Sequence, residues 1–239
     1  MDFLVEVAAW FTDPASWSGR DAISARVGEH LALSGVSLLA GLAIALPLGL
    51  FIGHTRRGAG AVVAITNVGR AVPSVGILGL ALPITLQLGW GIGVPPTLLA
   101  LTVLAIPPIV LNAYVGIRDV EPELVEAARG MGMRESQVLR RVELPIALPV
   151  ILAGVRTASI QVIATATLGA ILSTGGLGRY IVDGLARQDY PRMFGGALLV
   201  MILALTSEVL FALAQRAAVS PGLRGASARL PETEAALAQ

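Results

Sequence analysis

The sequence predicts an all-α fold, a polytopic membrane bundle of five transmembrane helices, or of six if one long apolar stretch is divided. Hydrophobic residues form 55% of the 239-residue chain and charged residues only 14%, whereas about 25% of a typical soluble domain is charged. The mean hydropathy is +0.77. The chain also has 27 glycines and 14 prolines, and small residues let membrane helices pack closely. Such a composition indicates a bilayer protein.

The N-terminal segment, residues 1–26, has the pattern of a short helix at the outer membrane interface. It lacks the basic start of a signal peptide and carries Asp2 and Glu6 instead. A helix here would place its apolar residues on one face and end at Asp13-Pro14. These apolar residues are Phe3, Leu4, Val7, Trp10 and Phe11. We expect a transmembrane domain over 27–218 and, from its Pro-, Gly- and polar-rich composition, a flexible cytoplasmic tail over 219–239.

Five stretches are long enough to cross a bilayer, which requires about 20 mostly apolar residues. They are 31–53, 59–88, 92–115, 145–172 and 193–215. The second is interrupted by Arg70, Pro73 and Ser74, so it is either one kinked helix or two shorter ones. In the first, small residues spaced by four predict close packing against another helix. This strip consists of Gly41, Ala45, Gly49 and Gly53.

The arginines predict the orientation, because basic residues near span ends are retained in the cytoplasm. Arginines are more frequent near the span ends on one side of the membrane than on the other. The side with more arginines is the one on which residues 116–144 and the C-terminus would lie. We therefore expect the N-terminus outside and the C-terminus in the cytoplasm. A net charge of +1 gives no reason to expect nucleic-acid binding. Without cysteine, and with His30 and His54 far apart, no metal site is expected.

The longest hydrophilic stretch, 117–144, has the pattern of two short helices joined by a turn. Pro122 and Glu123 suit the start of the first helix, and Gly130 or Gly132 can provide the left-handed residue that ends it. The second helix is expected over 134–142, before a new span begins at Pro145. Small residues flanked by methionines would form a surface that another protein can bind. The alternatives are a simple connection or a hairpin on the lipid headgroups.

This segment resembles the EAA loop of binding-protein-dependent ABC importer permeases. The resemblance rests on Glu126-Ala127-Ala128, on Gly132, and on Val142-Glu143-Leu144-Pro145, in which Val142 replaces the usual Ile. It implies that segment 117–145 is a coupling helix-turn-helix docked on an ATPase subunit. The coupling interface would then consist of Glu126, Ala127, Ala128, Gly130, Met131, Gly132 and Met133.

The resemblance also implies the partners and the location. The chain has no GxxxxGK[ST] phosphate loop and no lysine, so ATP and Mg²⁺ belong to a separate ATPase and this chain is not an enzyme. The complex would contain two ATPase subunits, a second permease that is identical or related, and an extracytoplasmic binding protein. It would lie in the cytoplasmic membrane of a bacterium.

Two further regions, 67–83 and 144–185, resemble permeases for osmoprotectants such as glycine betaine, choline, carnitine and proline. Permeases for amino acids such as methionine share parts of this pattern and remain the alternative. A secondary transporter or channel is a further, less favoured alternative. The chain offers few aromatic residues for a cage that would hold a quaternary ammonium. Solute recognition is therefore assigned to the binding protein.

Polar residues inside the spans are candidates for the transport path. Arg156 either lines the path or pairs with Glu208 in the last span, and we favour a structural role. Gln161 and Thr165 either contact the solute or serve the helix itself. After the fourth span, three glycines predict an outer turn that is a gate or a simple helix stop, followed by a solvated loop over 179–192. These glycines are Gly175, Gly176 and Gly178.

Overall fold

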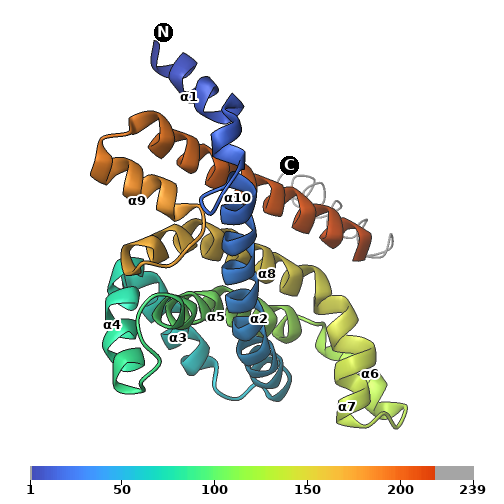
Figure 1. The fold of residues 1–239 in the computed structure, drawn as a ribbon. Helices are drawn as coiled ribbons and strands as arrows, with labels where there is room; N and C mark the ends of the chain where they lie inside the picture. The colour runs from blue at the N-terminus through green and yellow to red at the C-terminus, as the bar shows by residue number, and fades with distance from the viewer. Residues whose placement is uncertain (1, 219–239) are drawn as a thin grey trace, which may run out of the picture.

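The computed structural model describes residues 2–218, and all regular secondary structure in this range is helical (Figure 1). The predicted tail over 219–239 lies outside the described residues. The elements, in chain order, are α1 (Asp2–Thr12), η1 (Pro14–Trp17), α2 (Ile23–Thr55), α3 (Ala59–Ala71), α4 (Ser74–Gln87), α5 (Val94–Arg118), α6 (Pro122–Gly130), α7 (Glu135–Val138), the π-helical η2 (Leu139–Glu143), α8 (Leu144–Ala166), η3 (Thr167–Leu172), α9 (Gly178–Arg187) and α10 (Tyr190–Ala218).

Four helices in the described range are long and apolar enough to cross a membrane. They are α2, α5, the continuous helical run over Glu135–Leu172, and α10. The long stretch at 59–88 forms two helices, because Pro73 cannot continue α3 and instead stands before α4. With 13 and 14 residues, α3 and α4 are each too short to span alone.

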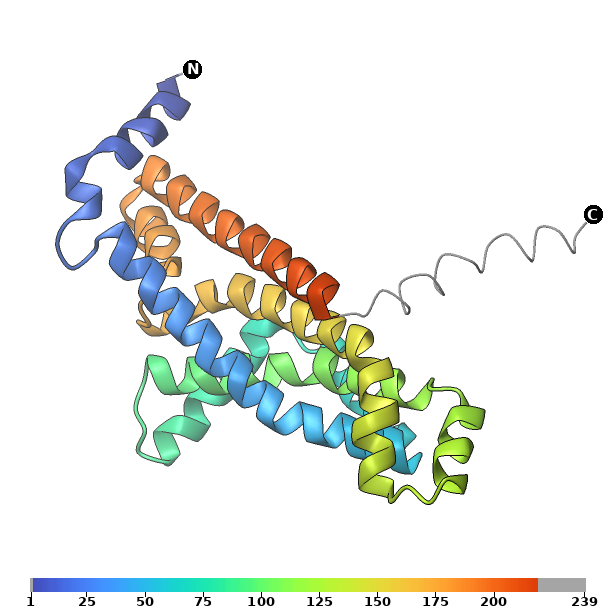
Figure 2. The ribbon, with the colours of Figure 1, turned by 90° about the vertical axis from the view of Figure 1, so that its right-hand side faces the viewer.

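Helix α5 lies at the centre of the bundle and packs against α2, α3, α4 and α8 (Figures 1 and 2). The small-residue strip of α2 faces it. A Cβ atom added to Gly41 or Gly49 would lie 2.6 Å from Ala105 or Ala113 of α5. The predicted packing role of the strip is confirmed: glycine lets the two backbones approach closely. Leu101, Ile109 and Val110 of α5 belong to the main buried cluster.

One predicted helix boundary is wrong. The helix expected to end at Val142 continues without interruption into α8, because residues 139–143 adopt π-helical hydrogen bonds that connect α7 to α8. This correction joins a predicted surface segment to a membrane helix. The division into a segment over 1–26 and a transmembrane domain over 27–218 remains a prediction; α2 itself begins at Ile23.

The segment after the fourth span is also more ordered than predicted. Residues 178–187 form α9 instead of a solvated loop, and α9 packs against α10. Its apolar face contributes Tyr180, which is 2% exposed and lies in a cluster with Ile23 and Val200. Burial of this face stabilises α9, although the low average hydrophobicity of the segment does not predict a buried helix.

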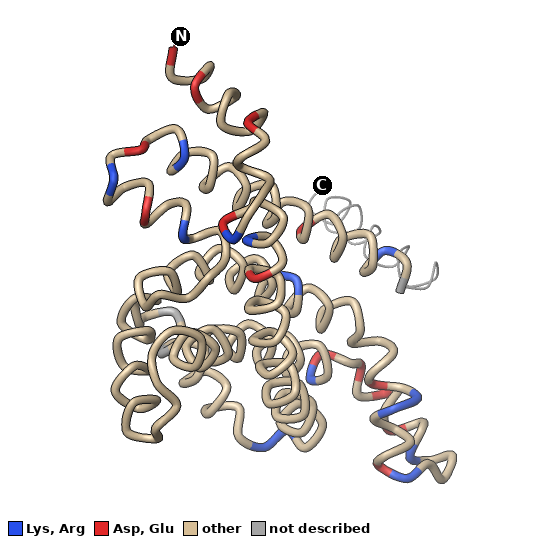
Figure 3. The backbone as a smooth tube through the Cα atoms, in the orientation of Figure 1, with Lys and Arg blue, Asp and Glu red and all other residues tan. Residues whose placement is uncertain are grey.

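Charged residues gather at two opposite ends of the molecule (Figure 3). One group lies on α6, α7 and η2, and the other lies around α1, α9 and the start of α2. The long helices between these ends carry few charges. This arrangement fits two aqueous phases separated by an apolar layer.

Candidate functional site: the hydrophilic hairpin and the intramembrane polar groups

The hydrophilic hairpin over 120–146 is a small folded unit. Helix α6 begins at Pro122 and carries Glu123 in its first turn, where a carboxylate interacts favourably with the helix dipole. Gly132 makes the turn with a φ of 83°, a conformation that glycine adopts without strain; Gly130 is still helical. The two arms bury Val125 and Val138 between them.

Fewer of the predicted interface residues are exposed at the tip of the hairpin than expected. Met131 is 72% exposed, and Glu126, Ala127, Gly130 and Gly132 also lie on the surface. Ala128, however, is only 2% exposed and Met133 is half-buried. Both pack into the cluster formed by Val120, Val125, Ala128 and Val138. The expectation that Ala128 lies on the binding surface is therefore wrong, since it follows Val125 by three residues and shares its inward face.

Two carboxylates connect the hairpin to the end of α2. His54 Nδ1 lies 2.5 Å from Glu143 Oε2, and His54 Nε2 lies 3.2 Å from Glu135 Oε2. Arg129 donates two hydrogen bonds to Glu135, at 2.9 and 3.0 Å. This ion pair with Arg129 stabilises the ionised form of the Glu135 carboxylate. The hairpin therefore has a polar connection to a membrane helix.

No local sequence pattern predicts this connection, because His54 and Glu143 are 89 residues apart. Within residues 2–218, no group of three or more His, Asp and Glu side chains is placed to hold a metal ion. Glu143 is only 4% exposed, and burial of a carboxylate requires a partner such as this imidazole.

Arg156 of α8 and Glu208 of α10 form an ion pair between two membrane helices. Nearby, the hydroxyl groups of Ser159 and Ser207 share a hydrogen bond of 2.9 Å across the same helix pair. A charge at this depth requires a partner, and the pairing expected from the sequence is present. It fits the structural role that we favoured, because it holds α8 against α10.

The other candidate path residues divide into two groups. Gln161 lines a cavity of about 600 Å³ bounded by α3, α4, α5 and α8. Arg156, Glu208 and the half-buried Thr165 are not among the residues that line it. The polar lining residues comprise Thr66, Ser74, Asn112, Thr157 and Gln161. The sequence pattern does not single out Thr66, Ser74, Asn112 or Thr157, because they lie on separate segments that only the fold brings together.

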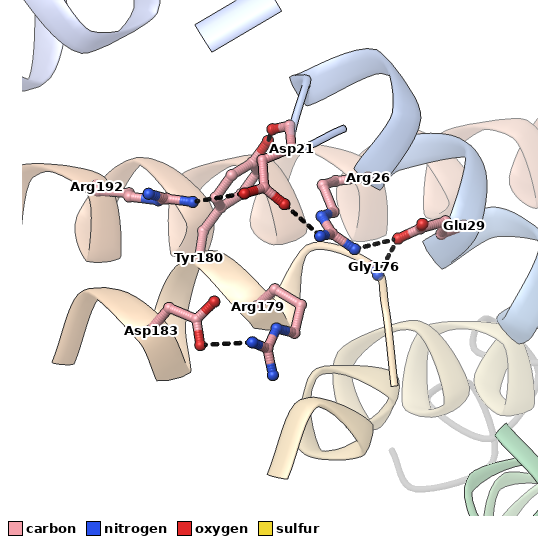
Figure 4. Close-up of polar contacts among 8 residues, drawn as sticks. All are labelled: Asp21, Arg26, Glu29, Gly176, Arg179, Tyr180, Asp183 and Arg192. Atoms are coloured by element: carbon pink, nitrogen blue, oxygen red, sulfur yellow. Dashed lines mark hydrogen bonds and ion pairs between the residues drawn. The ribbon is translucent and has the colours of Figure 1, made fainter. Parts of the chain in front are cut away.

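The glycine turn after η3 packs against the start of α2 (Figure 4). Glu29 Oε2 accepts hydrogen bonds of 2.7 Å from both the Gly176 backbone N–H and Arg26. Gly176 has a φ of 87°. A Cβ on Gly178 would lie 2.2 Å from the Thr167 carbonyl oxygen, so no larger residue fits there. Gly175 also faces Glu29.

Ionic contacts extend this cluster to α9 and α10 (Figure 4). Asp21 pairs with Arg26 and lies 3.9 Å from Arg192, and the Arg26 hydrogen bond lowers the pKa of Asp21. Tyr180 donates a 2.5 Å hydrogen bond to the Asp21 carbonyl. Within α9, Arg179 and Asp183 form an ion pair of 2.9 Å. The cluster fastens three helices at the end opposite the hairpin.

These features define a multi-pass helical membrane protein with one folded hydrophilic hairpin. Residues 45–225 match the family described as "Binding-protein-dependent transport system inner membrane component". The chain belongs to this family of membrane transport components.

The similar curated proteins are permeases. The chain is 37% identical over 200 residues to the glycine betaine/carnitine/choline transport system permease protein OpuCB of Bacillus subtilis (strain 168), a match that covers 84% of this chain and 90% of that protein. It is 36% identical over 198 residues to the osmoprotectant import permease protein OsmW of Salmonella typhimurium, which covers 82% and 91% of the two chains.

A solved structure with a similar fold belongs to the MetNI methionine ABC transporter in an inward-facing conformation. The TM-score is 0.75 at 28% identity, and the match covers 87% of this chain and 100% of the other. The helical bundle is therefore that of an ABC importer permease.

Proposed function

We propose that this chain is the transmembrane permease subunit of an ATP-driven importer for a small osmoprotectant such as glycine betaine, choline or carnitine. The similarity to permeases of this substrate group, at 37% identity over 84% of the chain, is the observation that carries the proposal. The methionine transporter structure is less similar in sequence, at 28% identity. A secondary transporter would not need the folded hairpin.

In this proposal, the hairpin is the coupling element. Its exposed tip, with Glu126, Ala127 and Met131, docks on an ATPase subunit that binds ATP and Mg²⁺, and this chain hydrolyses nothing itself. The link from His54 to Glu135 and Glu143 and the helical continuity of the hairpin with α8 support the coupling role. A displacement of the tip would then move two membrane helices together.

The complex has two such permeases, identical or related, with two ATPases and one extracytoplasmic binding protein. Helices α3 and α4 cross the membrane together, so the chain spans it five times in a bacterial cytoplasmic membrane. The N-terminus, α1 and α9 then face the binding protein, and the hairpin and the C-terminus face the cytoplasm. The separation of the two charged ends supports the placement of the hairpin and α9 on opposite sides of the membrane (Figure 3).

The test is solute uptake by vesicles that contain this permease, its ATPase and its binding protein. We expect labelled glycine betaine to accumulate only when ATP is on the ATPase side, with methionine excluded. Omission of the binding protein is the control and should abolish uptake. Accumulation driven by an ion gradient without ATP would contradict the importer, and accumulation of methionine instead would contradict the substrate class.

A further inference from the structure

The junction between α2 and the hairpin is built from three ionisable side chains. His54 lies in the last turn of α2. Glu135 and Glu143 lie on the second arm of the hairpin, which runs through α7 and η2 into α8. His54 Nδ1 is 2.5 Å from Glu143 Oε2, and His54 Nε2 is 3.2 Å from Glu135 Oε2. The imidazole ring is therefore held between two carboxylates, one at each ring nitrogen.

This arrangement requires a proton at both ring nitrogens. An unprotonated ring nitrogen and a carboxylate oxygen are both acceptors, and two acceptors reach a hydrogen-bond distance such as 2.5 Å only with a proton between them. The carboxylate of Glu135 likewise favours an N–H at Nε2. A neutral imidazole has only one N–H. The pair of His54 and Glu143 therefore holds one additional proton, whichever of the two side chains carries it.

Loss of this proton breaks one side of the junction. The single N–H of a neutral ring can serve Glu143 or Glu135 but not both. If it serves Glu135, the carboxylate of Glu143, a residue only 4% exposed, faces a bare nitrogen, which is costly for a buried charge. If it serves Glu143, Glu135 faces the bare nitrogen instead. In either case the second arm loses one of its two contacts with α2.

The other charged groups of the surrounding elements are paired elsewhere or exposed. Arg129 of α6 donates two hydrogen bonds to Glu135. At the end of α5, Arg118 pairs with Asp119 at 2.8 Å and lies over the Tyr114 ring. Within residues 2–218, no third carboxylate lies within ion-pair distance of the imidazole. The remaining arginines at the end of α2 and along the second arm are exposed; they are Arg56, Arg57, Arg134, Arg140 and Arg141.

The junction also adds a directional contact between the second arm and the bundle. Leu139 of this arm packs against the apolar cluster that contains Ile117 of α5, but hydrophobic contact has no preferred direction. A charge-assisted hydrogen bond fixes the geometry of its two partners. Gly53, next to His54, lies so close to α5 that an added Cβ would be 2.7 Å from Ile117 Cβ. His54 therefore ties the second arm to a tightly packed pair of membrane helices.

We propose that His54 and Glu143 position the hairpin through their shared proton, and that loss of this proton at alkaline pH lowers the amount of solute imported per ATP. The inference rests on the proposed function and adds its regulation. Because the joined state holds the proton, the junction is complete at lower pH and is lost as the pH rises. The hairpin can then move without carrying α2 with it, and ATP hydrolysis continues with less transport.

The test uses the complete complex in vesicles, with the ATPase, saturating binding protein and labelled glycine betaine. The pH on the ATPase side is set to about 6.5 or about 9, on either side of the range in which a carboxylate-paired histidine is expected to lose its charge. The readout is the solute imported per ATP hydrolysed, since the ATPase has a pH dependence of its own. We expect this ratio to fall about fivefold at the higher pH, as for the loss of one hydrogen bond.

Glu143→Gln separates the shared proton from a merely structural contact. The new amide can donate to Nδ1 of a neutral ring and leave the N–H at Nε2 for Glu135, so both contacts survive at either pH. We expect the ratio to stay at the wild-type value of the lower pH. His54→Gln removes the titrating ring, and its ratio should not vary with pH. Stimulation of ATP hydrolysis by the loaded binding protein shows that each variant complex is assembled.

Glu123→Gln is the matched control. It is the same change of a carboxylate to an amide in the same hairpin, but Glu123 is exposed in the first turn of α6 and is not in contact with His54. This variant should keep the wild-type fall of the ratio at the higher pH. A flat profile here would mean that any loss of charge from the hairpin abolishes the pH dependence, and it would overturn the assignment to His54 and Glu143.

The other outcomes separate the two proposals. A wild-type ratio that is the same at both pH values overturns the shared proton and leaves the importer intact. An equal fall in the wild type, Glu143→Gln and His54→Gln would place the pH dependence elsewhere, such as at His30, the other histidine of the chain, and also overturns the inference. A fall in the wild type that either variant removes supports it. Absence of ATP-driven uptake at both pH values contradicts the proposed function itself.

Discussion

Replacement of Gly132 by Asp is expected to abolish solute uptake while the permease still inserts and assembles. Gly132 is exposed and has a φ of 83°, and no atom of the described residues lies within 4 Å of an added Cβ. The left-handed conformation costs a non-glycine residue about 1 kcal/mol, too little to unfold the hairpin. The new carboxylate, however, would project from the surface that we assign to the ATPase, near Glu126 and Met131.

An unpaired charge at such an interface costs several kcal/mol, so uptake should fall by at least about tenfold. ATP hydrolysis in the same vesicles should lose its response to the loaded binding protein. Gly28→Ala is the matched control, because Gly28 is also exposed and no described atom lies within 4 Å of an added Cβ, but it is helical and lies in α2, outside the hairpin. That change should stabilise α2 by about 0.5–1 kcal/mol and leave uptake unchanged. Normal uptake by the Gly132→Asp protein would remove the coupling role from this tip.

The second large effect is expected at Gly49, where α2 and α5 are closest. A Cβ at this position would lie 2.6 Å from Ala113 Cβ and 2.9 Å from the Val110 carbonyl oxygen. Backbone atoms cannot move aside as a flexible side chain can, so Gly49→Ala must push the two helices apart. Overpacking of this kind costs about 1–3 kcal/mol or more, and the buried cluster along α5 would open.

Thermal unfolding of the detergent-solubilised protein, followed by size-exclusion chromatography, measures this effect. We expect a lower Tm and more aggregate for Gly49→Ala. Gly35→Ala is the matched control, since Gly35 lies in the same helix but, in the part of the chain that the structure describes, no atom lies within 4 Å of an added Cβ. Equal Tm values for the two variants would show that the close approach of α2 and α5 does not determine stability.

Local sequence patterns predict the helices well where one physical signal dominates. The spacing of Gly41, Gly49 and Gly53 alone predicts the face of α2 that contacts α5, because only small residues permit that approach. Pro73 marks the division of 59–88 into α3 and α4. The ion pair of Arg156 and Glu208 follows from the cost of an unpaired charge inside a membrane.

Features that depend on tertiary contacts could not be predicted in this way. Helix α9 has charges typical of a loop, and its packing against α10 and η3 stabilises it as a helix. Ala128 belongs to a motif that suggested an exposed surface, but the fold of the hairpin turns it toward Val138. The pairing of His54 with Glu143 joins residues 89 positions apart, and no periodicity or local motif connects them.

The cavity on the candidate path also could not be predicted from local sequence patterns. Gln161 could be selected from its position within a span, whereas Thr66 and Ser74 gain significance only because the break after α3 places them opposite α8. Threonine in a membrane helix usually bonds back to its own backbone, as Thr167 does to Ala164 at 2.8 Å. The hydroxyl of Thr66 is an exception, because it has no hydrogen-bond partner among the described residues.

Site-directed cross-linking tests the central claim, that the exposed tip of the hairpin contacts an ATPase, most directly. The chain contains no cysteine, so Met131→Cys introduces a single thiol at a position that is 72% exposed. Leu185→Cys on α9, which is 61% exposed at the opposite charged end, is the control. With a short thiol-reactive cross-linker and the assembled complex, we expect the Met131→Cys protein to be joined to the ATPase and the Leu185→Cys protein to remain free of it. Cross-linking of the ATPase to the Leu185→Cys protein but not to the Met131→Cys protein would contradict the account.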